Sequence, residues 1–305
     1  MRRKHQVEYR LLKALSAVVR RLPYRAALAL GWVLAALLFY VVRFRVRAAY
    51  QRLDAVFGDQ FRPCERRRIA WTSLRNLCFN AVEILRFPLL DKTWVQQHVD
   101  ARGVDFMKAT RDPQQGAILA VPHMGNWDLA GVGGHILGLP IFFMARRQKN
   151  PLTDTWLNEL RSVTGVETIM TDQSGALRKV IRYLKQGKVF AMLPDVRARE
   201  SGIAVSFLGG TAILATGMEM FARREGAPIF PAYALREGWT RHRWVVLPPV
   251  WPDPAVPRAA DQARIMQDVM RHFEAAIRAH PEQYFWYNKR WILDPFKNPI
   301  PPPAP

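Results

Sequence analysis

The sequence predicts an α/β fold in which a mixed central β-sheet is flanked by helices. The first observation is a set of short apolar runs, rich in Val, Ile and Phe as buried strands are. They occupy residues 117–121, 141–145, 188–193, 228–235 and 243–250. The second observation is that helical patterns lie between these runs, at residues 127–138, 151–165, 174–187, 216–226 and 260–281. Strands that alternate with helices form a sheet whose faces the helices cover.

The N-terminal region predicts attachment to a membrane. Residues 26–42 contain no charge, and as a helix they would be about 25 Å long, slightly less than the roughly 30 Å hydrocarbon core. They could therefore span with a tilt or insert at a shallow depth. Before them, up to Pro23, apolar residues recur at helical spacing beneath Lys and Arg, as in a basic interfacial helix. The alternatives are a buried core helix and a cleaved signal peptide, which the following "RFRVR" disfavours.

Residues 46–100 show helical patterns as far as Pro88. We therefore expect three parts: basic N-terminal membrane-associating helices over residues 1–50, a main domain over residues 51–298, and a disordered Pro-rich tail over residues 299–305.

The net charge of +20 indicates a polyanionic partner: an anionic membrane, a phosphorylated substrate or a nucleic acid. The first 70 residues hold 16 Lys and Arg against 4 Asp and Glu. Because this excess flanks an apolar helix, it favours a membrane over nucleic acid. The two cysteines, Cys64 and Cys78, form no CxxC motif, and HExxH is absent from the sequence. We therefore expect a reduced compartment, no structural metal and no bound cofactor.

The segment "ILAVPHMGNWDLAG", residues 118–131, places His123 just after a strand. Ligands of open α/β sheets collect at this carboxyl end. Asn126 is suited to cap the next helix. If Met124 and Gly125 form a turn, Asp128 can approach the imidazole, fix its tautomer and leave the other nitrogen free as a general base. The alternative is a structural histidine beside a strand.

Five segments in order resemble the bacterial lipid A late acyltransferases, the lauroyl and myristoyl transferases, and the related acyltransferases of phosphatidylinositol mannosides. They are "PHMGNWDLAG", "ARRQKNPLTDTWLNELRSVTG", "LPDVRARESGIAVSFLGGTAILATG", "GAPIFPAY" and "HPEQYFWYNKRW". The resemblance runs from about residue 5 to residue 297. It implies a glycerolipid acyltransferase-like fold in residues 51–298, with His123 and Asp128 as the catalytic pair.

The resemblance also implies an enzyme at the cytoplasmic face of the bacterial inner membrane. It would move a fatty acyl chain from acyl carrier protein or coenzyme A to a glycolipid hydroxyl, with a lipid A precursor as the first candidate. Asp128 stands where lipid A transferases more often have Glu, which also fits the mannoside branch. The other candidate acceptors are ornithine lipids and lysophospholipids, although the EGTR-like block of glycerolipid acyltransferases is absent from the sequence. A non-catalytic, lipid-binding membrane protein is the alternative from another class.

Further residues are candidates for substrate binding, each with a structural alternative. Arg146 matches an arginine of the second segment and would contact phosphate or a carbonyl, or be a solvated surface residue. Asp195 follows a strand and could hold Arg146 or the acceptor sugar, or cap a loop. The remaining candidates are Asn126, Arg197, Phe207, Gly209, Gly210 and Arg290. The aromatic residues of "HPEQYFWYNKRW" suit either a membrane interface or core packing.

Overall fold

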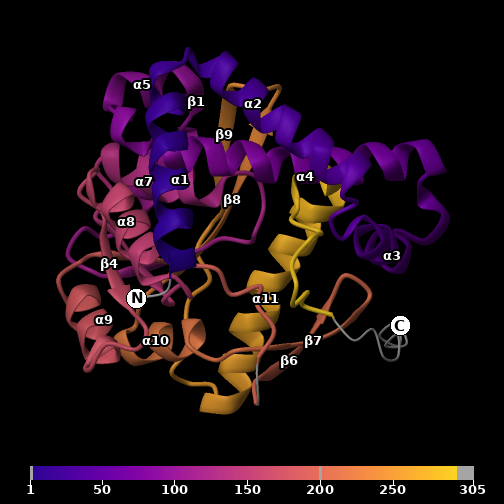
Figure 1. Cartoon of the computed structure of the whole chain (residues 1–305). Helices are drawn as coiled ribbons and strands as arrows, with labels where there is room; N and C mark the ends of the chain where they lie inside the picture. Colours follow the sequence, from indigo (N-terminus) through magenta and orange to yellow (C-terminus); the bar gives the residue numbers. More distant parts are fainter. Residues whose placement is uncertain (1–2, 199–200, 294–305) are drawn as a thin grey trace.

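The computed structural model describes residues 3–198 and 201–293, so the expected tail over residues 299–305 lies outside the described residues. At its centre is a seven-stranded sheet with the order β1-β9-β8-β2-β5-β3-β4. Neighbouring strands run parallel except β8 and β9, which are antiparallel. This mixed sheet with helices around it (Figure 1) confirms the predicted fold class.

The elements alternate along the chain as expected. The strands of the central sheet are β1 (Val99–Asp100), β2 (Ala117–Ala120), β3 (Ile141–Ala145), β4 (Glu167–Met170), β5 (Val189–Met192), β8 (Ile229–Glu237) and β9 (Arg241–Val246). A separate hairpin consists of β6 (Ile203–Phe207) and β7 (Gly210–Leu214). The helices are α1 (Arg3–Arg21), α2 (Tyr24–Ala36), α3 (Val46–Phe57), α4 (Pro63–Leu85), α5 (Lys92–His98), α6 (Arg102–Thr110), α7 (Trp127–Ile136), α8 (Pro151–Ser162), α9 (Ala176–Lys185), α10 (Met218–Glu225) and α11 (Arg258–Ala279).

Both faces of the central sheet are covered. Successive side chains of a strand point to opposite faces. On one face, Ile118 and Phe190 pack in a cluster with residues of α9, α10 and α11. On the other face, Leu119 and Ala191 pack in a second cluster with residues of α6 and α7. Because the strands are buried on both faces, their sequences are continuous apolar runs rather than alternating patterns.

Four strands had no clear sequence signal. β1 contains two residues and β4 begins with the polar pair Glu167 and Thr168; both strands lie at an edge of the sheet. Edge strands are commonly short or charged. β6 and β7 alternate buried and exposed residues, as a hairpin with one solvated face does.

The N-terminal helices pack against the rest of the protein. The break expected at Pro23 separates α1 from α2, and a π-helical turn (Leu37–Val41) continues α2. α1 runs along α8, and α2 runs along α4. A Cβ atom at Gly31 would lie 3.1 Å from a Val82 methyl carbon, so this glycine lets α2 approach α4 closely. By length and composition alone, Tyr24–Val41 could cross a membrane, and 28% of this segment is buried.

Candidate active site

The loop after β2 presents His123 at the carboxyl end of the sheet. Gly125 has a φ of +59°, and a Cβ there would lie 2.1 Å from the backbone oxygen of Ala234, so only glycine fits this turn. The Asn126 side chain accepts a hydrogen bond from the Leu129 amide at 3.0 Å and caps α7. The expected turn at Met124 and Gly125 and the expected cap are therefore confirmed.

Asp195 is the carboxylate that binds His123. One carboxylate oxygen lies 2.8 Å from Nδ1 of the imidazole, and the other accepts the His123 backbone amide at 2.9 Å. Asp195 follows β5, which is the parallel neighbour of β2. The parallel register brings the two carboxyl ends together although the residues are 72 positions apart in sequence. The Asp195 side chain is 1% exposed and that of His123 is 21% exposed, so the imidazole keeps access to a ligand.

The environment raises the pKa of His123 above its ordinary value. Burial favours the neutral imidazole, but the charge and hydrogen bond of Asp195 favour the protonated form more strongly, and the charge of Asp128 adds to them. Tyr284 lies close to the same carboxylate: burial, and then the charge of Asp195, raise the pKa of this phenol well above its usual range. Tyr284 therefore stays neutral beside the His123 and Asp195 pair.

The expected direct pairing of Asp128 with the imidazole is corrected by the structure. Asp128 lies in the first turn of α7 and accepts hydrogen bonds from Nε and Nη2 of Arg161 on α8, at 3.2 and 3.1 Å. Asp195 holds the imidazole nitrogen that Asp128 was expected to hold. The expectation that Asp195 binds Arg146 is replaced in the same way. Arg161 had no signal in the sequence, because nothing in the α8 pattern distinguishes it from an ordinary helix-surface arginine.

A cavity of about 180 Å³ lies between α7 and the face of the sheet that packs against α6 and α7. Its lining is mainly apolar, and its charged lining residues are Asp128 and Arg161. Trp127 also lines it, and the Trp127 ring meets the His123 ring edge-on with centroids 5.0 Å apart. Trp127 therefore connects the cavity to the imidazole, which does not itself line it. It continues along the small residues of α7, Ala130, Gly131 and Gly134.

Three of the expected substrate-binding residues lie on the surface. Arg146 is exposed just after the carboxyl end of β3. Arg197 is exposed, and its backbone forms an isolated bridge with Leu214 of the hairpin. Arg290 is exposed in the C-terminal segment. The structure places none of these three described arginines in the lining of the cavity.

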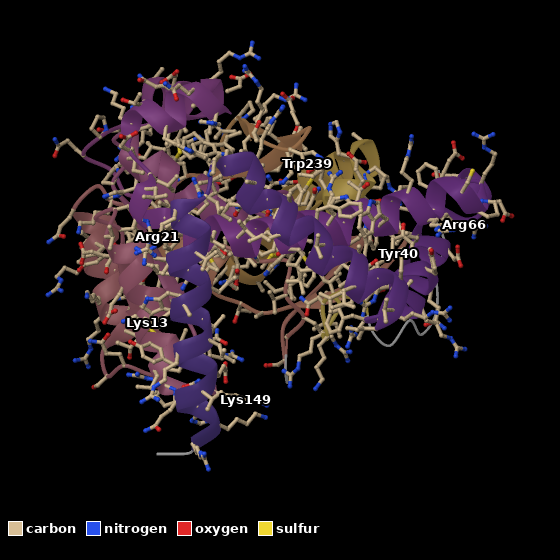
Figure 2. The ribbon with its side chains drawn as sticks, turned by 45° about the horizontal axis from the view of Figure 1, so that its top comes forward. Lys13, Arg21, Tyr40, Arg66, Lys149 and Trp239 are labelled. Carbon is tan, nitrogen blue, oxygen red and sulfur yellow. The ribbon has the colours of Figure 1, made fainter. Side chains whose placement is uncertain are left out.

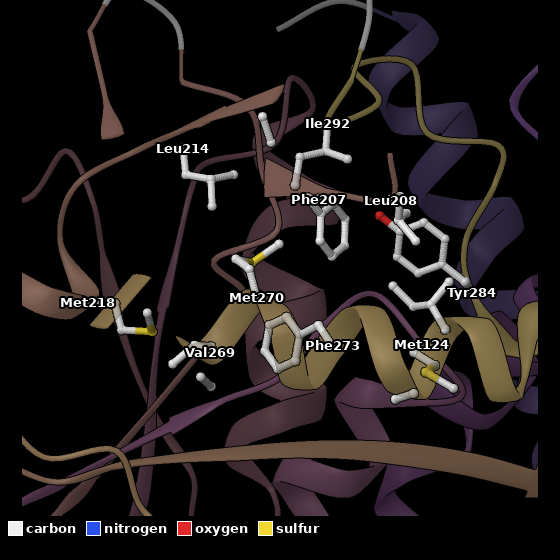
Figure 3. Packing of buried hydrophobic residues seen from close by; sticks show 14 of the residues in the cluster. Met124, Phe207, Leu208, Leu214, Met218, Val269, Met270, Phe273, Tyr284 and Ile292 are labelled. Carbon is white, nitrogen blue, oxygen red and sulfur yellow. The ribbon is translucent and has the colours of Figure 1, made fainter. Parts of the chain in front are cut away.

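The residues expected in the "SFLGG" segment support the hairpin instead of lining the cavity. Phe207 is 1% exposed and lies in the core beside Met270 and Phe273 (Figure 3). Gly209 and the preceding Leu208 both have positive φ, as a two-residue hairpin turn requires. A Cβ at Gly210 would meet the Leu293 side chain at 3.4 Å. The expected substrate contact at Phe207 is therefore corrected to a core position, Gly209 lies in the hairpin turn, and Gly210 begins β7.

The C-terminal aromatic residues pack in the core. Tyr284, Trp286, Tyr287 and Trp291 are at most 3% exposed. The segment also supports the loop that contains His123: the Phe285 amide donates to the His123 carbonyl oxygen at 2.9 Å, and the Gly125 amide donates to the Gln283 carbonyl oxygen at 2.9 Å. Of the two interpretations of this motif, core packing is confirmed for these four rings.

Comparisons with known proteins show the family to which the sequence is related. The sequence profile of the family described as bacterial lipid A biosynthesis acyltransferase matches residues 2–292. The phosphatidylinositol mannoside acyltransferase of Mycolicibacterium smegmatis is 26% identical over 214 residues, 70% of this chain and 68% of the relative. Its namesake in Mycobacterium tuberculosis is 24% identical over 220 residues, 70% of this chain and 66% of the relative. The lipid A biosynthesis acyltransferase of Haemophilus influenzae is 24% identical over 199 residues, 64% of this chain and 59% of the relative.

Replacing Asp195 by Asn should lower the pKa of His123, because the variant loses the negative charge that stabilises the imidazolium. Asp128→Asn should lower it less, since Asp128 acts on His123 through charge without a hydrogen bond. The imidazole would then become neutral at a lower pH in both variants. An NMR titration of His123 measures this, with the other histidines as internal controls. An unchanged His123 titration in Asp195→Asn would contradict the electrostatic assignment.

Proposed function

Because the chain belongs to the bacterial lipid A biosynthesis acyltransferase family, and is therefore an acyltransferase, we propose that it acylates a glycolipid hydroxyl with His123 as general base. The acyl donor would be a thioester of acyl carrier protein or coenzyme A. The observation that carries the proposal is the His123 and Asp195 pair beside an apolar cavity. The pair supplies a base at the place where the cavity could hold an acyl chain.

The proposed reaction proceeds by direct attack. With Asp195 accepting the Nδ1 proton, the neutral imidazole has Nε2 free to take the proton of the acceptor hydroxyl. The hydroxyl oxygen bonds to the thioester carbonyl carbon, and a tetrahedral intermediate forms. When this intermediate collapses, the carbon–sulfur bond breaks, and the imidazolium returns its proton to the leaving thiolate. An ester and a free thiol are the products.

Asp128 and Arg161 would act at the mouth of the cavity. Their side chains are 19% and 21% exposed, so both groups are partly solvated and accessible to a ligand. The negative charge of Asp128 assists the imidazolium that forms during the reaction. The Arg161 guanidinium would face the thioester carbonyl, where negative charge develops in the transition state. Arg161 would thereby make the carbonyl contact that the sequence suggested for Arg146.

The apolar cavity would bind the acyl chain. A hydrocarbon tail gains roughly 0.8 kcal/mol of transfer free energy for each buried methylene. The cavity is lined mainly by aliphatic and aromatic side chains, and its charged end is at Asp128 and Arg161. Gly131 lets α7 approach the Phe143 side of the cavity closely, because a Cβ at Gly131 would lie 2.4 Å from the Phe143 ring.

For the acceptor, a lipid A precursor is the first candidate, and a phosphatidylinositol mannoside is the second. Both candidates follow from the names of the relatives: lipid A biosynthesis acyltransferase in Haemophilus influenzae and phosphatidylinositol mannoside acyltransferase in two mycobacteria. Both acceptors are anionic lipids with sugar hydroxyls, which a protein of net charge +20 suits. Mass spectrometry of host glycolipids with and without the protein distinguishes them.

Replacing His123 by Ala should reduce acyl transfer by about 10²- to 10⁴-fold, the usual contribution of a general base. Asp195→Asn should have a comparable effect, because the imidazole loses its tautomer control. The assay uses the full chain in lipid vesicles with acyl-coenzyme A or acyl carrier protein as donor and each candidate glycolipid as acceptor. Asp172→Asn, which removes a half-exposed partner of Arg147, is the matched control and should keep full activity. Near-normal turnover by His123→Ala would refute the mechanism.

Val104→Phe should shorten the preferred acyl chain, because Val104 lines the cavity and is 4% exposed. Each methylene that no longer fits should cost about fourfold in kcat/KM, the equivalent of roughly 0.8 kcal/mol. The measurement is the ratio of rates with long and short acyl donors. Val166→Phe, at a buried position outside the cavity lining, perturbs packing similarly and should leave this ratio unchanged. An unchanged ratio in Val104→Phe would place the acyl chain elsewhere.

We further propose that α1 and α2 lie in the plane of one membrane leaflet, on the cytoplasmic face of the inner membrane. α2 is packed along α4, while its opposite face exposes Leu30 and Val33, and the π-helical turn after it exposes Leu37. A helix held along α4 in this way could not cross a bilayer without taking α4 with it. Figure 2 looks onto this side, where Lys13 and Arg21 lie along α1 and Tyr40 lies at the end of α2. The basic residues would contact anionic headgroups.

Replacing Leu11 and Leu15 together by Glu should weaken vesicle binding at least about tenfold, since two exposed apolar side chains of α1 become charged. Sedimentation with vesicles containing anionic lipid measures the binding. Leu177→Glu, at a similarly exposed leucine of α9, is the control and should bind as the unchanged protein does. Equal binding of the double variant would remove α1 from the membrane interface.

A further inference from the structure

A second buried carboxylate, Glu83 of α4, lies behind the catalytic loop. Its side chain is 2% exposed, and two nitrogens of Arg236 on β8 donate to its two oxygens at 2.7 and 2.6 Å. The Tyr24 hydroxyl and the Asn126 side-chain amide also donate to it. His242 of β9 lies 3.3 Å away. Four elements besides α4 therefore meet at one carboxylate.

This carboxylate stays ionised. Burial alone would favour its neutral form, but the charge of Arg236, together with hydrogen bonds from Arg236 and His242, holds the pKa of Glu83 well below its usual range. Burial also lowers the pKa of His242, which favours a neutral imidazole there. Removing two charges from water is costly, and a buried ion pair often stabilises a fold no better than apolar residues would. The geometry of the cluster therefore suggests a role beyond stability.

The cluster holds the end of the loop that begins at His123. Asn126 uses its amide nitrogen to contact Glu83 and its oxygen to cap α7. Arg236 donates to the Asn80 side chain at 2.9 Å, and Asn80 in turn donates to the Gly125 carbonyl oxygen at 2.6 Å. Asp195 thus anchors the loop at its start, and Glu83 and its partners anchor it at its end.

The cluster also reaches the N-terminal helices. Tyr24 is the first residue of α2. Arg86, one turn beyond Glu83, donates to the Leu22 carbonyl oxygen at 2.8 Å, and its guanidinium lies over the Tyr24 ring. The junction between α1 and α2 is therefore linked, through Tyr24 and Arg86, to the Glu83 cluster that contacts the loop of His123.

From these contacts we propose that Glu83 is a positioning residue for catalysis: by fixing Asn126, it holds His123 in the orientation that Asp195 requires. The inference rests on the proposed function. Glu83 does not line the cavity, and its contact with the loop of His123 is made through Asn126. Its loss should therefore reduce turnover while donor binding in the apolar cavity persists.

The test compares Glu83→Gln, Asn126→Ala and the double variant in the full chain, with acyl-coenzyme A as the probe. Each single variant should lower kcat by about 10- to 100-fold and leave the KM for the donor within about twofold. The acid limb of the pH profile should shift to lower pH, because a loosened contact with Asp195 lowers the pKa of His123. Asp195 and Asp128 are the carboxylates that act on this imidazole. If Glu83 acts through Asn126, the double variant should be no slower than the slower single variant.

Asp261→Asn is the matched control. Asp261 is a fully buried carboxylate that pairs with Arg223 and Arg264 away from the loop. Asp261→Asn should lower the melting temperature, as Glu83→Gln should, but it should leave kcat and the pH profile unchanged. Asn126→Ala keeps the Glu83 and Arg236 pair intact, so it provides the test if Glu83→Gln does not fold.

The outcomes separate the two proposals. Full activity in His123→Ala would defeat the proposed function. An inactive His123→Ala, together with normal kcat in Glu83→Gln and Asn126→Ala, would overturn only the role of Glu83. Multiplicative losses in the double variant would show that Glu83 does not act through Asn126, and would also overturn the inference.

Discussion

The contact between Asp195 and His123 is the interaction on which the site depends. One carboxylate binds both the backbone amide and the imidazole of the same residue. This bidentate contact sets the position of the loop as well as the tautomer of the ring. It exists because β2 and β5 are parallel neighbours whose carboxyl ends lie together. The sheet order therefore determines which carboxylate meets the imidazole.

Helix α7, which follows this loop, borders two different environments. Its first turn carries Asp128 toward Arg161, in a partly exposed polar region. Further along, its small residues leave space against the sheet for an apolar cavity. An acyl thioester has the same division, with a polar reactive end and a hydrocarbon tail. Because charge and cavity are close together along α7, this one helix would serve both parts of the proposed substrate.

Sequence patterns located the main parts of this arrangement. Five apolar runs indicated the strands, and Gly125 and Asn126 indicated the turn after β2 and the capped helix that follows it. The partner of the imidazole could not be found in this way. Asp128 is five residues from His123, whereas Asp195 is 72 residues away and became a partner only through strand pairing. Local spacing favoured the nearer carboxylate, and the sheet brought the farther one into contact.

The sequence alone determined the periodicity of strands and helices, the position of His123 after a buried strand and the basic, apolar character of the N-terminus, because these depend on neighbouring residues. Tertiary structure decided which carboxylate meets the imidazole, where Glu83 and Arg236 bury their charges, and that Phe207 belongs to the core. These outcomes depend on strand order and helix packing between distant segments. A contact between distant residues leaves no periodic or local signal in a single chain.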